Sequence, residues 1–327
     1  MNFPDLSPLT GCNILITGAT GMIGSELVHT LMEQSTQFGF SVYALGRNPV
    51  RAKMLFSKYD SRDEFHFIRH DITKEFRETV DFHYIFHLAS GAAPNVMEEN
   101  PVGVMRANII GTDHLLSYGI KHNMKRFLFV SSGEIYGEGC NGAFSETDCG
   151  YVDNMQSRSC YPSSKRAAET LCVAYQTQFG ADIVVARPCH IYGASFTEED
   201  NRAYAQFIRN VANGEKVVLK SSGRQYRSWL FVKDCVSALL YILLKGASGE
   251  AYNVADENSC LTLRELAETI AEIGGQQVVY NGDSCDRRGG SNISRAIFNT
   301  EKLRRLGWSP AFSFQEAITS IFEQTKS

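Results

Sequence analysis

Short runs of apolar and β-branched residues alternate with longer stretches of helical periodicity through the first half of the chain. The runs predict strands near residues 13–17, 41–45, 65–68, 84–88 and 126–131. Helical stretches lie between them, one beginning after Gly21 and another at Pro101, where Asn100 suits the cap position. Strands that alternate with helices pair in parallel through right-handed crossovers. The predicted fold class is therefore α/β, with a Rossmann-like, doubly wound parallel sheet.

The regular alternation ends after Pro188. A helix over 161–179 stops at Gly180 and leads into a further strand at 182–187. Beyond it lie loops, a helix near 204–212, the short run KVVLK and two final helices separated by QVVY. We predict one domain of residues 1–187, joined by about 228–256, and a smaller C-terminal α/β domain of residues 188–327.

Composition and charge exclude several classes of protein. The 327 residues carry a net charge of −4 without a basic run, so a nucleic-acid partner is not expected. The first residues lack the basic and apolar segments of a secretory leader, and no later apolar run reaches membrane-spanning length. We therefore expect a cytoplasmic protein without a membrane partner. Nine scattered cysteines form no Cys-x-x-Cys pair, so we expect neither a metal site nor a disulfide framework.

A glycine-rich loop follows the first predicted strand directly. The stretch ITGATGMIG places Gly18, Gly21 and Gly24 at the end of that strand and at the start of a helix. Glycines at such a turn allow a pyrophosphate to approach the N–H groups of the helix N-terminus. The loop therefore predicts a dinucleotide site, whose expected contacts are Gly18, Thr20, Gly21, Met22, Ile23 and Gly24.

The residues that close the second strand bear on the choice of dinucleotide. A carboxylate there accepts hydrogen bonds from the adenosine ribose, whereas an arginine pairs with a 2′-phosphate. This chain has Gly46 and Arg47. NAD is the expected cofactor, NADP is possible because of Arg47, and the same arginine could instead stack on adenine.

Tyr161 and Lys165 lie four residues apart at the start of a helical stretch. This spacing places both side chains on one helix face, where the lysine charge can lower the pKa of the tyrosine. Ser132 follows the strand at 126–131, on the edge of the sheet that also carries the glycine loop. Together the three residues predict a proton-transfer site beside the dinucleotide.

These motifs resemble the extended short-chain dehydrogenase/reductase family, and the resemblance spans nearly the whole chain. It implies that Tyr161 removes a sugar hydroxyl proton, that Lys165 binds the nicotinamide ribose and tunes the tyrosine, and that Ser132 holds the substrate oxygen. It also implies a nucleotide-diphosphate sugar substrate, bound in the domain of residues 188–327. The further cofactor contacts that it implies are Asp71, Ile72, Leu88, Ala89, Ser90, Tyr161, Lys165 and Pro188. For Asp71 a helix cap before ITKEF is an equal alternative.

The segment from Ser145 to Tyr175 is most similar to that of UDP-glucuronate decarboxylases. That resemblance implies catalytic roles for Glu134 and Arg227, with Arg227 and His190 contacting the substrate. Two positions depart from the pattern: Gly133 replaces a serine, and His190 replaces an asparagine. Arg227 also fits a diphosphate clamp.

Other readings stay open beside decarboxylation. They are a nucleotide-sugar 4-epimerase, an NADPH-dependent 4-keto-sugar reductase, and a dinucleotide-binding protein without turnover. The set of Ser132, Tyr161 and Lys165 argues against the last, because a binding module needs no activated tyrosine. The family resemblance also implies a homodimer built from helices near 102–121 and 161–179.

Overall fold

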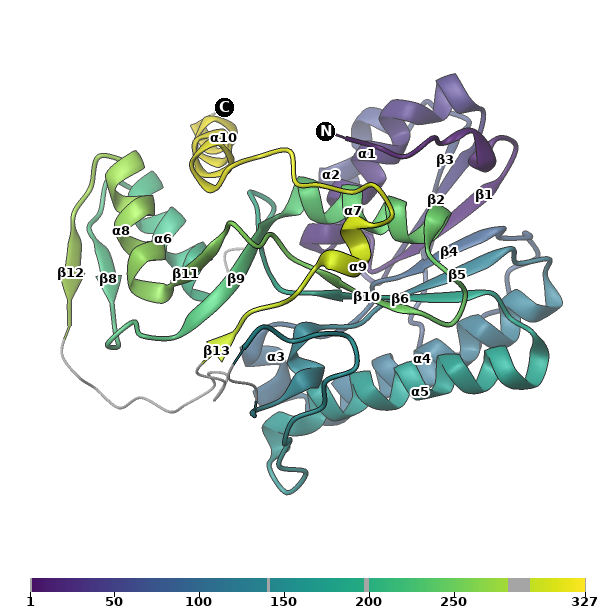
Figure 1. Cartoon of the computed structure of the whole chain (residues 1–327). Coiled ribbons are helices and arrows are strands. Elements are labelled where there is room, and N and C mark those ends of the chain that lie inside the picture. Colours follow the sequence, from purple (N-terminus) through teal and green to yellow (C-terminus); the bar gives the residue numbers. More distant parts are fainter. Residues whose placement is uncertain (1, 140–141, 197–199, 282–294, 327) are drawn as a thin grey trace.

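The computed structural model describes residues 2–139, 142–196, 200–281 and 295–326. Its main feature is a seven-stranded parallel sheet in the order β10-β6-β5-β4-β1-β2-β3 (Figure 1). The strands are β1 (Asn13–Thr17), β2 (Ser41–Gly46), β3 (Phe65–Arg69), β4 (Tyr84–His87), β5 (Arg126–Val130), β6 (Ile183–Pro188) and β10 (Ala251–Val254). The strand order reverses at β1, where ligands of doubly wound sheets bind. The predicted fold class is confirmed.

Helices cover both faces of this sheet, as its buried strands require. On one face Ile14 and Ile16 of β1 join a core with α1 (Met22–Phe38), α2 (Pro49–Phe56) and α7 (Val232–Lys245). On the other face Leu15 packs in a second core with α4 (Pro101–Lys121) and α5 (Cys160–Phe179). The alternation along β1 follows from the opposite directions of successive strand side chains.

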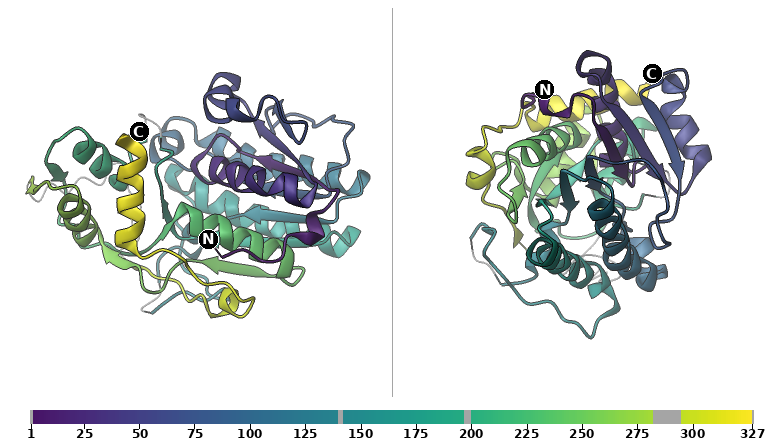
Figure 2. Two further views of the ribbon diagram at one scale, coloured as in Figure 1. Left: turned by 90° about the horizontal axis from the view of Figure 1, so that it is seen from above. Right: turned by 90° about the vertical axis from the view of Figure 1, so that its right-hand side faces the viewer.

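A second lobe lies beyond the carboxyl ends of the strands (Figure 2). Its larger sheet has the order β11-β9-β13, with β7 also paired to β9, and β12 pairs with β8. Its strands are β7 (His190–Tyr192), β8 (Val217–Leu219), β9 (Tyr226–Phe231), β11 (Cys260–Thr262), β12 (Val278–Tyr280) and β13 (Arg295–Ala296). Its helices are α6 (Ala203–Ala212), α8 (Leu263–Ile273) and α10 (Phe314–Lys326), and α9 (Glu301–Arg304) lies near β10.

The chain passes between the two lobes more than once. After β9 it returns through α7 to β10, which pairs with β6 at the edge of the seven-stranded sheet. A segment within residues 228–256 therefore packs with the N-terminal lobe. None of the helices in the described part of the chain is long and apolar enough to cross a membrane.

Candidate active site

A cleft of about 1120 Å³ lies between the carboxyl ends of the central strands and the second lobe. Residues of both lobes line it, and it extends from the glycine loop to β9. All the candidate site residues from the sequence lie on its wall: Gly18, Thr20, Gly21, Met22, Ile23, Gly24, Arg47, Asp71, Ile72, Leu88, Ala89, Ser90, Ser132, Glu134, Tyr161, Lys165, Pro188, His190 and Arg227. The fold thus brings the dinucleotide, catalytic and substrate candidates into one space.

The glycine loop has no room for side chains at two of its positions. Gly18 has a φ of +66°, and a Cβ there would lie 2.8 Å from the backbone nitrogen of Ala89. A Cβ at Gly24 would lie 2.3 Å from the carbonyl oxygen of Gly18. The N-cap of α1 is Gly21, which leaves the first N–H groups of the helix without a side-chain cap. This loop fits a dinucleotide pyrophosphate, which such N–H groups bind.

Two arginines line the end of the cleft beside β2. Arg47 follows β2 directly, and Arg51, in the first turn of α2, donates from Nε to the carbonyl oxygen of Thr20 at 2.8 Å. Asp71 caps no helix, because a turn and no helix follows it. Its Oδ1 accepts from the backbone nitrogen and the hydroxyl of Thr73, at 3.0 and 2.9 Å. Arg51 was not predicted, since nothing in the sequence shows that α2 turns it toward the glycine loop.

Tyr161 and Lys165 lie in the first turns of α5, both almost fully buried. Nζ of Lys165 donates to the carbonyl oxygen of Val130 at 2.7 Å, at the end of β5. Burial lowers the pKa of Lys165 to about 7, although the charge of Glu169, one turn further along α5, raises it. The helix therefore holds this amine at a fixed point beside the sheet edge.

Burial also dominates at Tyr161, where it raises the pKa to about 12. The Glu134 charge raises it further, while a hydrogen bond with Ser132 and the charges of Arg158 and Arg202 lower it. The sequence predicts that the lysine charge acts on the tyrosine, and Nζ of Lys165 lies 5.8 Å from the centre of the Tyr161 ring. That role stays a prediction, and Arg158 and Arg202 are two further cations that favour ionisation of the tyrosine.

Glu134 belongs to a 3₁₀ turn, Gly133–Tyr136, that follows β5. The hydroxyl of Ser132 caps this turn by accepting from the Glu134 backbone nitrogen at 3.1 Å. Both carboxylate oxygens of Glu134 accept from Nη2 of Arg158, each at 2.9 Å. Arg158 was missed in the sequence, because only the fold places it opposite Glu134.

Gly133, the first departure from the decarboxylase pattern, has a packing reason. A Cβ at this position would lie 2.4 Å from Cζ of Phe298, a residue of the cleft wall. A serine here would therefore require Phe298 to move. The aromatic ring therefore fills the space that any side chain at position 133 would need.

His190 and Arg227 form a hydrogen-bonded pair on neighbouring strands β7 and β9. Nη1 of Arg227 lies 2.7 Å from Nε2 of His190. Because guanidinium only donates, Nε2 must accept, which puts the imidazole proton on Nδ1. Burial and the charges of Arg227 and Arg202 keep the pKa of His190 well below its usual value. His190 is thus neutral: it accepts at Nε2 and carries its proton on Nδ1. Neither this Nδ1 nor Nε of Arg227 has a hydrogen-bond partner among the described residues.

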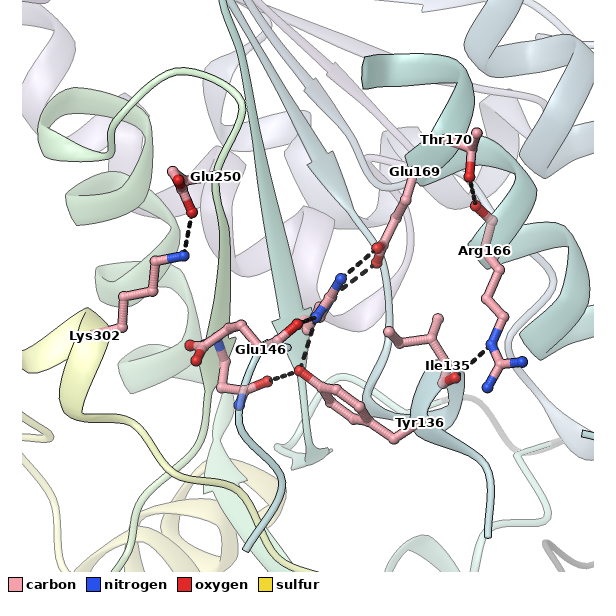
Figure 3. Close-up of polar contacts among 10 residues, drawn as sticks. Ile135, Tyr136, Glu146, Arg166, Glu169, Thr170, Glu250 and Lys302 are labelled. Carbon is pink, nitrogen blue, oxygen red and sulfur yellow. Dashed lines mark hydrogen bonds and ion pairs between the residues drawn. The ribbon is translucent and has the colours of Figure 1, made fainter. Parts of the chain in front are cut away.

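A network of polar contacts around Tyr136 and Glu169 joins elements that carry residues of this site (Figure 3). Arg187, the residue before the last of β6, donates from Nε and Nη2 to the two carboxylate oxygens of Glu169, at 3.1 and 2.7 Å. Its Nη1 donates to the Tyr136 hydroxyl at 3.0 Å, and that hydroxyl donates to Oδ1 of Asn253 at 2.6 Å. The network joins α5, the 3₁₀ turn and β10. It thereby fixes the elements that carry Lys165 and Glu134.

Within the described parts of the chain no cluster of three or more metal-ligating side chains occurs.

The sequence matches the profile of the NAD dependent epimerase/dehydratase family over residues 14–255. The chain belongs to this family.

Curated relatives and solved structures of the family agree with its assignment. UDP-glucuronic acid decarboxylase 6 of Arabidopsis thaliana is 33% identical over 314 residues, which cover 95% of this chain and 88% of the plant protein. UDP-glucuronic acid decarboxylase 1 of Xenopus tropicalis is 30% identical, covering 93% and 70%. The UDP-glucose 4-epimerase of Thermotoga maritima, solved with UDP-glucose, superposes with a TM-score of 0.80 at 25% identity, covering 96% and 98%.

Proposed function

We propose that the protein modifies a nucleotide-diphosphate sugar by transient oxidation of C4, and that its reaction is decarboxylation of UDP-glucuronate. The observation that carries the proposal is the cluster of Glu134, Arg158 and Arg227 beside Tyr161. It places a paired carboxylate and a buried arginine with a free donor next to the proton-transfer residue. The names of the most similar curated relatives support the same substrate.

The first step is removal of hydrogen from C4. When bound, the dinucleotide supplies a hydride acceptor and returns the hydride at the end of the cycle. Tyr161 accepts the C4 hydroxyl proton, and Ser132 holds the oxygen that carries it. The charges of Arg158 and Arg202 favour the ionised tyrosine that this step needs. Lys165 anchors the nicotinamide ribose from its fixed position at the end of β5.

Oxidation makes the carboxylate at C5 lie β to a ketone. The bond between C5 and the carboxylate can then break, releasing CO₂ while its electron pair passes into an enolate. A proton at C5 restores the ketone, the hydride returns to C4, and Tyr161 returns the proton to the C4 oxygen. The cycle is redox-neutral overall. Arg227 orients the carboxylate or the diphosphate, and Glu134, fixed by Arg158, steers the carboxylate or relays the proton.

A 4-epimerase is the second candidate. The observation that favours an epimerase is Gly133, which has the Phe298 ring packed against it. This position lacks the serine that the resembling decarboxylases use. Similarity to the Thermotoga epimerase points the same way.

An NADPH-dependent 4-keto-sugar reductase is a third candidate, favoured by Arg47, and would consume the reduced dinucleotide. A protein without turnover would have no use for a buried lysine beside a buried tyrosine.

A panel of nucleotide sugars, incubated with the purified protein and no added nicotinamide, tests the reaction by mass spectrometry. We expect UDP-glucuronate to lose CO₂. Glu134→Gln and Arg227→Lys should still show reduced-nicotinamide absorbance while CO₂ release falls about 10²-fold or more. Glu301→Gln, at an exposed ion pair with Arg305, is the control and should not change the rate. Epimers at C4 without CO₂ would exclude decarboxylation and return Arg227 to a diphosphate role.

We also propose that two copies associate through α4 and α5. These helices lie side by side and expose the apolar side chains of Val102, Met105, Ile110 and Val173. Such a face is covered when an identical pair of helices packs against it. The homodimer and the cytoplasmic location expected from the sequence both stay predictions.

A further inference from the structure

The end of the cleft beside β2 carries two arginines, Arg47 and Arg51, and one carboxylate, Asp71, whose Oδ1 is bonded to Thr73. We propose that Arg47 and Arg51 together bind a 2′-phosphate, so that the dinucleotide of this protein is NADP(H) rather than the NAD of the family's description. The inference rests on the proposed function only in using the same dinucleotide site. It holds for a redox-neutral cycle and for a net reductase alike.

The fold brings the end of β2 against the glycine loop. Strands β1 and β2 pair in register from Asn13 and Ser41 to Thr17 and Leu45, so Gly46 comes next to the turn. A Cβ at Gly46 would lie 3.4 Å from Cγ2 of Thr20, an ordinary contact. The residue after Gly46 therefore stands where the adenosine ribose of a doubly wound fold is bound.

Arg51 reaches this place from α2. The side chain of Asn48 caps that helix by accepting from the backbone nitrogen of Arg51 at 3.0 Å. The Arg51 side chain then turns to the glycine loop, where Nε donates to the carbonyl oxygen of Thr20. The bond fixes the guanidinium in the cleft wall. No described residue accepts from its two terminal nitrogens, which suit a phosphate because they lie in one plane.

The two arginines outnumber the single carboxylate at this end of the cleft. No close ion pair joins Arg47 or Arg51 to a carboxylate in the described segments. Burial raises the pKa of Asp71, but hydrogen bonds from Thr73 and the charge of Arg47 lower it below its usual value. Asp71 also lines this end of the cleft, but its Oδ1 is held by Thr73. Gly46 provides no carboxylate to accept from the ribose hydroxyls. The site therefore lacks the group that selects NAD and has two that select a 2′-phosphate.

Calorimetry with the whole protein tests this directly, because it measures binding and needs no turnover. The probes are NADP⁺, NAD⁺ and adenosine 2′,5′-bisphosphate, and we expect the first to bind more tightly than the second. Arg47→Ala and Arg51→Ala should each weaken NADP⁺ by about tenfold or more and NAD⁺ much less. Lys53→Ala removes an exposed charge of the same helix outside the cleft and should leave both unchanged.

Gly46→Asp provides the reverse test, since it adds the carboxylate that the site lacks. It should weaken NADP⁺ and strengthen NAD⁺, with circular dichroism confirming that the variant is folded. Equal or tighter binding of NAD⁺ by the natural protein would overturn the proposal. Equal losses for both dinucleotides in the arginine variants would overturn it too and indicate stacking on adenine. Tight NADP⁺ binding without turnover of any nucleotide sugar would instead contradict the proposed function alone.

Discussion

Lys165 and Tyr161 are ionisable side chains that the fold buries close to each other. Burial raises the pKa of the tyrosine to about 12 and lowers that of the lysine to about 7, so both side chains are driven toward neutrality. The arginines at 158 and 202 counter this at the tyrosine. Charges outside the tyrosine–lysine motif therefore add to the effect of the lysine on the tyrosine.

Tyr161→Phe should separate binding from chemistry. The change removes only the phenolic oxygen, so the dinucleotide should bind with unchanged affinity while turnover falls by about 10²- to 10⁴-fold. Calorimetry and product assays measure the two effects. Substantial remaining turnover would mean that another group accepts the proton.

Lys165→Met should stabilise the protein in a pH-dependent way. The folded pKa of the lysine is lowered below its unfolded value of 10.5, so the charged side chain is fully penalised below about pH 7. The penalty is lost as the pH rises from about 7 toward 10.5, because the folded state then releases its proton first. Urea unfolding should show a larger difference between variant and natural protein at neutral pH than near pH 10. A difference independent of pH would contradict the lowered pKa.

Sequence reasoning reached the residues whose position follows from spacing. The glycine loop, Ser132 and the tyrosine–lysine pair come directly after strands or share one helix turn, so the fold class fixes where they lie. Arg158 and Arg51 could not be found this way, because their partners depend on how separate segments pack. The same holds for Gly133, whose constraint is the ring of Phe298 in the second lobe.

At the scale of elements, the network around Arg187 joins α5 to the turn that carries Glu134. Burial opposes the charge of Arg187, but hydrogen bonds and the charge of Glu169 raise its pKa above the usual value. The helices α1, α4, α5, α6, α8 and α10 and six strands of the large sheet were predicted from periodicity, whereas β10 and α7 were not. Strands of two or three residues such as β7, β11 and β13 were not, because so few positions show no period.

Glu169→Gln should destabilise the fold by about 3–5 kcal/mol, since it leaves a buried guanidinium without its counter-ion. Tyr136→Phe should cost about 1–3 kcal/mol through the hydrogen bonds lost to Arg187 and Asn253. Urea unfolding measures both. Glu301→Gln, at a surface pair, is the matched control, with an expected change within about 0.5 kcal/mol. Changes as small as the control at the buried pair would show that the network does not brace the site.

At the scale of the whole molecule, the apolar face of α4 and α5 should decide the state of association. Val173→Glu places a charge on a side chain that is 49% exposed in the single chain and lies outside the cleft, so the change should convert a dimer into monomers. Met54→Glu, on the 79% exposed side chain of α2, should not. Light scattering at micromolar concentration measures the molar mass of the natural protein and of each variant. A monomeric natural protein at that concentration would rule out the proposed interface.

The two lobes enclose one site, and the central claim is that C4 of a bound sugar loses and regains its hydrogen there. The most direct measurement uses UDP-glucuronate with deuterium at C4 and the purified protein with no added nicotinamide. Mass spectrometry should find the deuterium on the nicotinamide when the reaction is interrupted, and back at C4 of a UDP-pentose at completion, with CO₂ released in equal amount. A product formed while deuterium never reaches the nicotinamide would contradict transient oxidation at C4.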